Sequence, residues 1–167
     1  MTAVQIILGA VLLQRLIELW IARRNTERLL AEGAIEVAPE HYHYFVVLHA
    51  AWLAALVLLT PHDAPVAVVW LAIFLLLQAG RIWVMASLGH LWTTRIVTLP
   101  GAPLVRTGPY RYLRHPNYLV VAAEIAVLPL VFALWEVAIV FSGLNAALLW
   151  IRIRAENEAL AERRALD

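Results

Sequence analysis

The chain has 167 residues, of which 63% are hydrophobic and 15% are charged, against roughly 45–50% apolar residues in an ordinary soluble domain. The net charge is +1, so charge does not indicate a nucleic-acid partner. The chain has no lysine and no cysteine, and the absence of cysteine excludes disulfides, zinc thiolates and thiol nucleophiles. A soluble domain this apolar would expose large apolar patches. We therefore predict an all-α integral membrane protein that forms a single domain over residues 1–167.

Three apolar runs in the first half of the chain are long enough to cross a bilayer, which takes about 20 residues with a range of roughly 17–25. They are Thr2–Ala22, Tyr44–Thr60 and Val66–Leu88. The first run lacks the basic start of a signal peptide and exceeds the roughly 7–15 apolar residues of a signal core. Arg23-Arg24 after it resembles a stop-transfer flank, so we interpret the run as a spanning helix.

The last apolar run, Tyr118–Ile151, is too long for one spanning helix. At 1.5 Å per residue it would measure about 51 Å, against a hydrocarbon core of about 30 Å. A break is required, and Pro129 with Glu136 marks the expected turn. This gives five spans, of which the last two form a short hairpin, and the helix of the fifth span is expected to continue into the cytosol from Arg152 as a C-terminal helix.

The positions of the arginines predict the orientation of the spans. The link Pro61–Pro65 has no arginine, and none precedes the first span. All the arginine-bearing links lie on one side if the N-terminus is outside and the C-terminus is in the cytosol. These arginines are Arg23, Arg24, Arg28, Arg95, Arg106, Arg111, Arg114, Arg152, Arg154, Arg163 and Arg164.

Polar side chains recur inside the spans at one depth, roughly 6–11 Å from the cytosolic ends by helical rise. Charges inside spans are rare and usually functional. Snorkelling side chains and structural ion pairs are the alternative. That alternative applies especially to Arg15 and Glu18, which lie three residues apart on one helix and can pair. The shared depth favours a polar cavity that binds substrate. The residues are Arg15, Glu18, His49, Arg81, Glu124 and Asn145, and we expect Arg15, Glu18, His49 and Glu124 to bind the substrate.

The densest polar stretch is Gly108-Pro109-Tyr110-Arg111-Tyr112-Leu113-Arg114-His115-Pro116-Asn117-Tyr118. Pro116 suits the first helical position, the free N–H groups of that helix end can hold an anion, and tyrosine rings can face an adenine or a sulfonium. Aromatic and basic residues also anchor helices at membrane interfaces. From the residues alone, both interpretations stay open.

This stretch resembles a motif of the isoprenylcysteine carboxyl methyltransferase family, and Arg152-Ile153-x-x-Glu156 is similar to that family's Arg-Ile-x-x-Glu-Glu. The resemblance covers about 104–160, and the N-terminal part is similar to a short bacterial branch of the family. It implies a membrane-embedded enzyme that uses S-adenosylmethionine, bound by about 89–167, in a bacterial inner membrane. The cofactor contacts it implies are Gly108, Tyr110, Arg114, His115, Tyr118 and Glu156.

The resemblance defines the methyl acceptor less closely than it defines the cofactor. The family's second glutamate is Asn157 here, Val120-Val121 replaces a frequent Gly-Glu, and the chain ends at Asp167. Short bacterial relatives include enzymes that resemble O-methyltransferases of alkylpyrone-type lipids. We therefore expect a lipophilic acceptor with an oxygen nucleophile, a carboxylate or an acidic enol or phenol, which needs no strong general base.

We expect Arg81, Arg152 and Glu156 to act in the chemistry, the two arginines by holding an anionic oxygen. The alternatives are an NADPH-dependent lipid reductase, a phospholipid N-methyltransferase favoured by Glu18 and Glu124, and a non-catalytic membrane scaffold or small transporter. No metal site is expected, because paired metal histidines do not stand out in the sequence.

Overall fold

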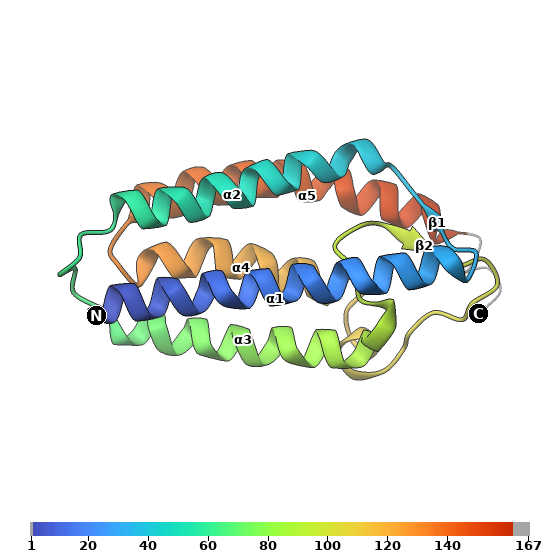
Figure 1. Cartoon of the computed structure of the whole chain (residues 1–167), viewed down its shortest axis with the longest axis horizontal. Helices are drawn as coiled ribbons and strands as arrows, with labels where there is room; N and C mark the ends of the chain where they lie inside the picture. Colours follow the sequence, from blue (N-terminus) through green and yellow to red (C-terminus); the bar gives the residue numbers. More distant parts are fainter. Residues whose placement is uncertain (1, 162–167) are drawn as a thin grey trace.

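The structure is a computed structural model that describes residues 2–161. It is a bundle of long helices whose largest links gather at one end (Figure 1). This confirms the predicted all-α membrane architecture. The helices are α1 (Ala3–Ala31), α2 (Tyr42–Leu59), α3 (Val68–Leu88), α4 (Pro116–Leu130) and α5 (Trp135–Ala159), with 3-10 turns η1 (Pro39–His41), η2 (Gly89–Leu91) and η3 (Gly108–Arg111).

Four of the helices, α1, α2, α3 and α5, are long and apolar enough to cross a membrane, and α4 is a shorter apolar helix. The 15 residues of α4 extend about 22 Å by helical rise, less than the hydrocarbon core. Large apolar side chains cover the outside of the bundle: Leu58 is 80%, Val68 74% and Leu76 72% exposed. Such a surface suits lipid rather than water.

Helix α1 is longer than predicted. It continues past Ala22 to Ala31, because the polar extension carries two (i, i+4) ion pairs, Arg23–Glu27 and Arg28–Glu32, which support an exposed helix. The N-terminal run was recognised from its hydropathy, and the extension lacks that signal.

The predicted break in the last apolar run is confirmed. Pro129 lies in the final turn of α4, and Glu136 lies in the first turn of α5. Between them Ala133 has a φ of +58°, a left-handed conformation suited to a tight turn. Helix α5 then continues through Arg152 to Ala159, as predicted for the C-terminal helix, whereas Arg163 and Arg164 lie outside the described residues.

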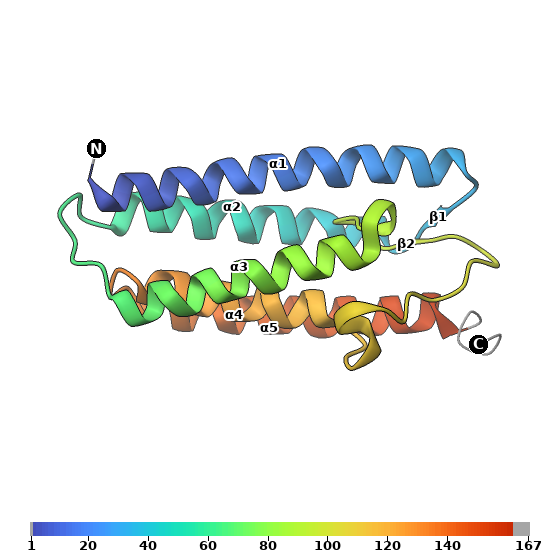
Figure 2. The same cartoon turned by 90° about the horizontal axis from the view of Figure 1, so that it is seen from below.

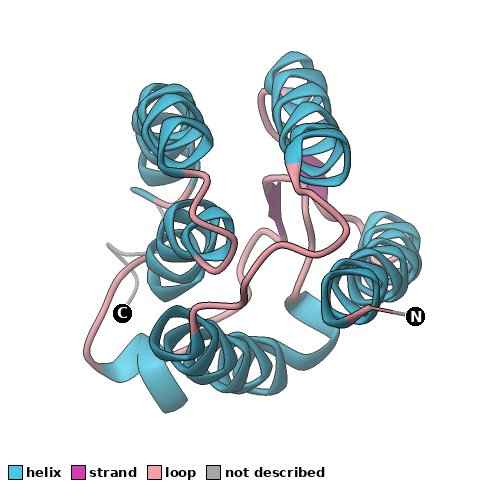
Figure 3. Cartoon of the chain, turned by 90° about the vertical axis from the view of Figure 1, so that its left-hand side faces the viewer, coloured by secondary structure: helices cyan, strands magenta, loops and turns pink. Residues whose placement is uncertain are grey.

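The helices pack around an apolar core at the end that holds the N-terminus of α1. Helix α4 packs against α3 and α5, and α2 packs against α5, while α1 runs beside α2, as Figures 1 and 2 show. All five helices contribute to the core, whose members include Val11, Trp52, Phe74, Leu128 and Val137. Seen from this end in Figure 3, the strands and long links lie behind the helices, at the opposite end of the bundle.

Candidate active site

The link between α3 and α4 is held in place by the segment between α1 and α2. Strands β1 (Ile35–Glu36) and β2 (Val97–Thr98) pair antiparallel, which the sequence did not predict. Arg95 forms an ion pair with Glu36 at 2.9 Å, and its guanidinium lies 4.6 Å from the ring centroid of Tyr42. The Asn25 amide donates to the Trp92 carbonyl at 2.8 Å. These contacts turn a Pro- and Gly-rich link into a fixed wall of a cavity.

Gly108 fixes the other end of this link against α3. Its φ is +56°, and a Cβ there would lie 2.0 Å from Ser87 Oγ and 3.1 Å from Trp83 Nε1. The motif's first glycine is therefore required by close packing rather than by ligand contact, and it is not among the residues that line the cavity.

Gly108→Ala is expected to destabilise the protein by about 1–3 kcal/mol through overpacking and a strained left-handed backbone. Thermal unfolding in mild detergent measures this loss, and the affinity for S-adenosylmethionine should fall with it. The control is Gly143→Ala in α5, where a Cβ meets nothing within 4 Å. Equal stability of the two variants would contradict the close docking of the loop.

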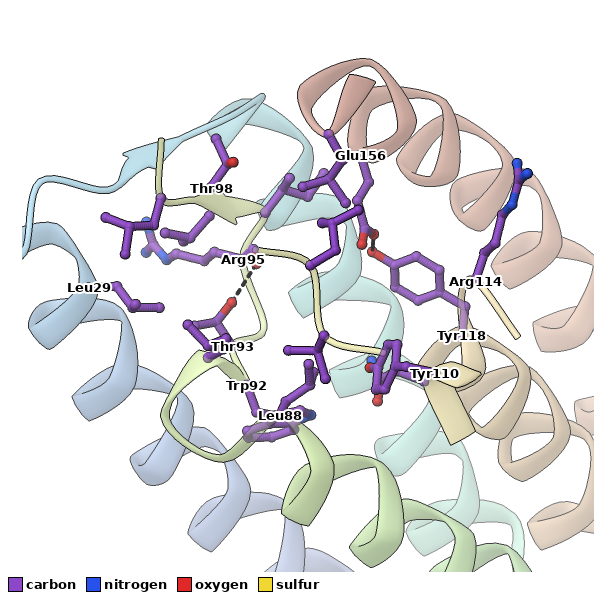
Figure 4. Close-up of a pocket in the computed structure, with 18 of the residues that line it drawn as sticks. Leu29, Leu88, Trp92, Thr93, Arg95, Thr98, Tyr110, Arg114, Tyr118 and Glu156 are labelled. Carbon is purple, nitrogen blue, oxygen red and sulfur yellow. Dashed lines mark hydrogen bonds between the residues drawn. The ribbon is translucent and has the colours of Figure 1, made fainter. Parts of the chain in front are cut away.

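The larger cavity has a volume of about 460 Å³, within the roughly 300–1,000 Å³ of small-molecule sites. Figure 4 shows residues from four parts of the chain around it: Leu29 of α1, Arg95 of the α3–α4 link, Tyr118 of α4 and Glu156 of α5. The Gly108–Tyr118 motif and the Arg152–Glu156 motif therefore meet in one site.

Tyr118 connects the two motifs. Its hydroxyl donates to Glu156 and accepts from Arg152 Nε at 2.9 Å. The Arg152 guanidinium also donates to the Thr94 carbonyl at 2.7 Å and lies 5.0 Å from the ring centroid of Phe45. Arg152 is only 7% exposed, so Arg152 and Glu156 are part of a built site rather than an exposed surface pair.

His115 lies behind Tyr118 and supports it. The two rings stack with centroids 5.5 Å apart and an interplanar angle of 16°. His115 Nε2 lies 3.1 Å from Asn157 Oδ1, and its Nδ1 lies 3.8 Å from Glu156 Oε1. His115 is not among the residues lining the cavity, so its position suits orienting Tyr118 and Glu156. Asn157, noted in the sequence only as a departure from the family pattern, takes part in this arrangement.

Tyr110 and Arg114 both line the larger cavity but differ in orientation. Burial raises the pKa of the Tyr110 hydroxyl above its ordinary value, and the negative charge of Glu156 acts in the same direction. Tyr110 therefore stays protonated as a hydrogen-bond donor. The exposed side chain of Arg114 points outward in Figure 4, away from Tyr118.

A second cavity of about 270 Å³ adjoins the first inside the bundle. Both are lined by Trp92, Asn117, Tyr118 and Arg152. Trp92 Nε1 and Asn117 Oδ1 are buried without a hydrogen-bond partner in the described part of the chain. Because unpaired buried polar atoms are costly, their position at the junction of the cavities favours a polar ligand there. The sequence analysis assigned no role to either residue, although Asn117 belongs to the motif.

The charged residues inside the spans form one cluster. Arg15 contacts Glu18 at 2.6 Å and Glu124 at 3.1 Å, and Arg81 contacts Glu18 at 3.2 Å and forms a second ion pair with Glu124. Gln78 also donates to Glu124 at 2.8 Å. Two guanidinium groups thus face two carboxylates, and the cluster ties α1 to α3 and α4.

Three of the four predicted substrate residues lie on the wall of the second cavity, and two of these three, Arg15 and Glu18, also belong to the charged cluster. Arg15, Glu18, His49 and Arg81 line the second cavity, whereas Glu124 is not among its lining residues. Asn145 is buried and lies outside the cluster and both cavity walls. Among residues 2–161, no three His, Asp or Glu side chains are arranged to hold a metal ion.

The sequence model of the isoprenylcysteine carboxyl methyltransferase (ICMT) family matches residues 69–162 of this chain. The chain belongs to this family. The matched part runs from α3 to the end of α5, and so it contains both motifs with Tyr118, Arg152 and Glu156.

Two relatives of the ICMT-family chain extend the likeness over nearly its full length. An uncharacterized protein of Bacillus subtilis, YpbQ, is 38% identical over 162 residues, which cover 94% of this chain and 96% of the relative. An uncharacterized protein of Haemophilus influenzae is 26% identical over 166 residues, 96% of each chain. No solved structure matches the chain significantly.

Proposed function

We propose that this ICMT-family protein is a membrane methyltransferase that methylates an oxygen atom of a lipophilic small molecule, such as an alkylpyrone-type or isoprenyl compound. The observation that supports this most is the pair of adjoining cavities that meet at Tyr118 and Arg152. One cavity opens among the polar links and the other lies among apolar helix faces. A polar donor and a lipophilic acceptor can therefore meet at one junction.

The larger cavity fits S-adenosylmethionine by size and by chemistry. Glu156 can accept hydrogen bonds from ribose hydroxyls or the amino group, and Tyr110 can donate one. The unpaired Trp92 Nε1 and Asn117 Oδ1 supply further partners at the junction. When bound, this cofactor supplies a methyl group activated by a positively charged sulfur.

The second cavity suits the acceptor. Its wall is mostly apolar, with Phe45, Trp52 and Leu149 among its residues. A molecule with a long hydrocarbon tail concentrates in the bilayer, because each buried CH₂ contributes about 0.8 kcal/mol. Burial in the bundle also keeps water out of the junction.

The residues of the junction act by positioning. Direct methyl transfer needs no covalent enzyme intermediate, so the main contribution of the protein is to hold donor and acceptor in line. Arg152, fixed by Thr94 and Tyr118, lines both cavities and is the residue we assign to orient the acceptor oxygen.

The test of this proposal is methyl transfer by purified protein in detergent micelles. The protein is incubated with methyl-labelled S-adenosylmethionine and one of three acceptors: a long-chain alkylpyrone, a prenylated cysteine derivative or phosphatidylethanolamine. Label is expected on oxygen of one of the first two. Exclusive methylation of the phospholipid nitrogen would contradict the oxygen acceptor, and equal turnover of short water-soluble analogues would contradict the lipophilic one.

We propose further that the protein resides in a bacterial inner membrane, with its N-terminus outside and the active-site end in the cytosol. Arg23, Arg24 and Arg28 of α1 and the arginines of the α3–α4 link lie at the same end of the bundle as the end of α5. The arginine bias of cytosolic links supports this orientation.

Single cysteines test the orientation, since the native chain has none. Asp63→Cys, in the exposed α2–α3 link, should react with an impermeant thiol reagent in intact spheroplasts. Thr107→Cys, exposed in the α3–α4 link, should react only after the membrane is permeabilised. The reverse pattern would contradict the proposed orientation.

A further inference from the structure

His49 lines the second cavity, and its hydrogen bond to the backbone defines which ring nitrogen carries the proton. Its Nδ1 lies 2.8 Å from the carbonyl oxygen of Phe45, one turn earlier in α2. A carbonyl oxygen can only accept, so Nδ1 carries the hydrogen. In the neutral ring Nε2 then holds an unshared electron pair, and His49 lines the cavity.

The arginines around this cavity already have partners in the protein. Arg15 of α1 and Arg81 of α3 are paired with Glu18 of α1 and Glu124 of α4. Arg152 of α5 donates to the Thr94 carbonyl and to Tyr118 of α4, whose hydroxyl contacts Glu156. The positive charges facing His49 are thus compensated or engaged, which differs from the expectation that Arg81 holds an anionic oxygen.

An ionised acceptor would enter this cavity at a cost. The rest of its wall is mostly apolar, including Trp52, Leu53 and Val121, and a buried charge without an opposite charge is strongly unfavourable. A neutral hydroxyl is cheaper to bury, but its oxygen becomes a good nucleophile only when a base removes the proton.

We infer that the acceptor binds as a neutral enol or phenol and that His49 Nε2 takes its proton; this inference rests on the proposed methyltransferase function. The acceptor oxygen forms a bond to the methyl carbon as the carbon–sulfur bond breaks. The electron pair of that bond leaves with sulfur, which becomes neutral. The hydroxyl proton forms an N–H bond at Nε2, and the resulting imidazolium returns it to water after the product leaves.

Two acceptors with the same alkyl tail test this assignment. One is a 4-alkylphenol, which is neutral at pH 8, and the other carries a nitro group that makes it largely ionised at that pH. His49→Gln should slow methylation of the alkylphenol about 10²–10⁴-fold, the usual range for loss of a general base. Methylation of the nitrophenol should change less than about threefold, since most of it is already ionised in solution and it depends far less on a base.

The matched control is His43→Gln, an exposed histidine on the same helix that lines neither cavity. It should leave both rates unchanged. An equal fall in the methylation rates of both acceptors in His49→Gln would show that His49 has a structural role. An unchanged methylation rate for the alkylphenol would show that His49 has no role in the reaction. Either result overturns the inference.

Nitrophenol binding in the absence of S-adenosylmethionine tests the role of His49 independently of the proposed methyltransferase function. The visible absorbance of the nitrophenol reports the ionised fraction of the bound probe at fixed pH. That fraction should be lower in His49→Gln than in the wild-type protein and in His43→Gln, and an unchanged fraction would overturn the inference. If the wild-type protein methylates neither acceptor, the proposed function fails while this measurement still reports on His49.

Discussion

Glu156→Ala is expected to lower the affinity for S-adenosylmethionine at least hundredfold, a loss of about 2.8 kcal/mol. Glu156 accepts from the Tyr118 hydroxyl and is the acidic side chain of the larger cavity. Its removal takes away a charged hydrogen-bond acceptor for the cofactor. It also leaves the hydroxyl of Tyr118, which lines both cavities, without its acceptor. Equilibrium binding of labelled S-adenosylmethionine to detergent-purified protein measures the loss.

The control for this variant is Glu158→Ala, an exposed glutamate two residues later on the same helix. It should bind the cofactor normally. The unfolding temperature of Glu156→Ala should fall by several degrees without loss of the fold, because the lost hydrogen bond contributes about 1–3 kcal/mol and each kcal/mol shifts the midpoint by about 2–4 °C at this chain length. Binding within a few-fold of wild type in Glu156→Ala would remove this residue from the cofactor site.

Glu124→Ala is expected to destabilise the protein by about 3–5 kcal/mol, the usual cost of breaking a buried ion pair from one side. Glu124 is 2% exposed and contacts Arg81, Arg15 and Gln78. Its removal leaves two guanidinium groups to share Glu18 in an apolar surrounding. Denaturation of purified protein in mixed detergent micelles measures the change.

The paired variant Arg81→Met with Glu124→Leu is the matched control for this effect. It removes one charge of each sign and keeps the Arg15–Glu18 pair, which is joined at 2.6 Å. Stability should return to within about 1–2 kcal/mol of wild type, because apolar replacement of a whole buried pair is often neutral. A paired variant as unstable as Glu124→Ala alone would contradict charge balance as the reason for the cluster.

The helices and their breaks could be predicted because hydropathy and length decide them. The run from 118 to 151 had to break, and the proline that the chain places there is where α4 ends. The depth of Arg15, Glu18, Arg81 and Glu124 also followed from helical rise, and the four side chains meet in the structure. Hydropathy, run length and helical rise along single helices are enough for such predictions.

The partners of each side chain could not be predicted in the same way. Whether Arg152 faces solvent or Tyr118 depends on how α4 packs against α5, because the (i, i+4) spacing of Arg152 and Glu156 is equally compatible with a pair on an exposed helix face. Strand β2 forms only because the link after α1 lies beside it, and two-residue strands leave no periodic signal. The resemblance to the family identified the motif, but not that Gly108 packs against Ser87 or that His115 stacks behind Tyr118.

Competition binding distinguishes a methyltransferase from a lipid reductase. Purified protein is titrated with labelled S-adenosylmethionine, and unlabelled S-adenosylhomocysteine or NADPH is then added. Saturable binding at one site per chain is expected, displaced by S-adenosylhomocysteine and unaffected by NADPH. Absence of saturable S-adenosylmethionine binding, together with tight binding of NADPH, would contradict the methyltransferase and favour a lipid reductase.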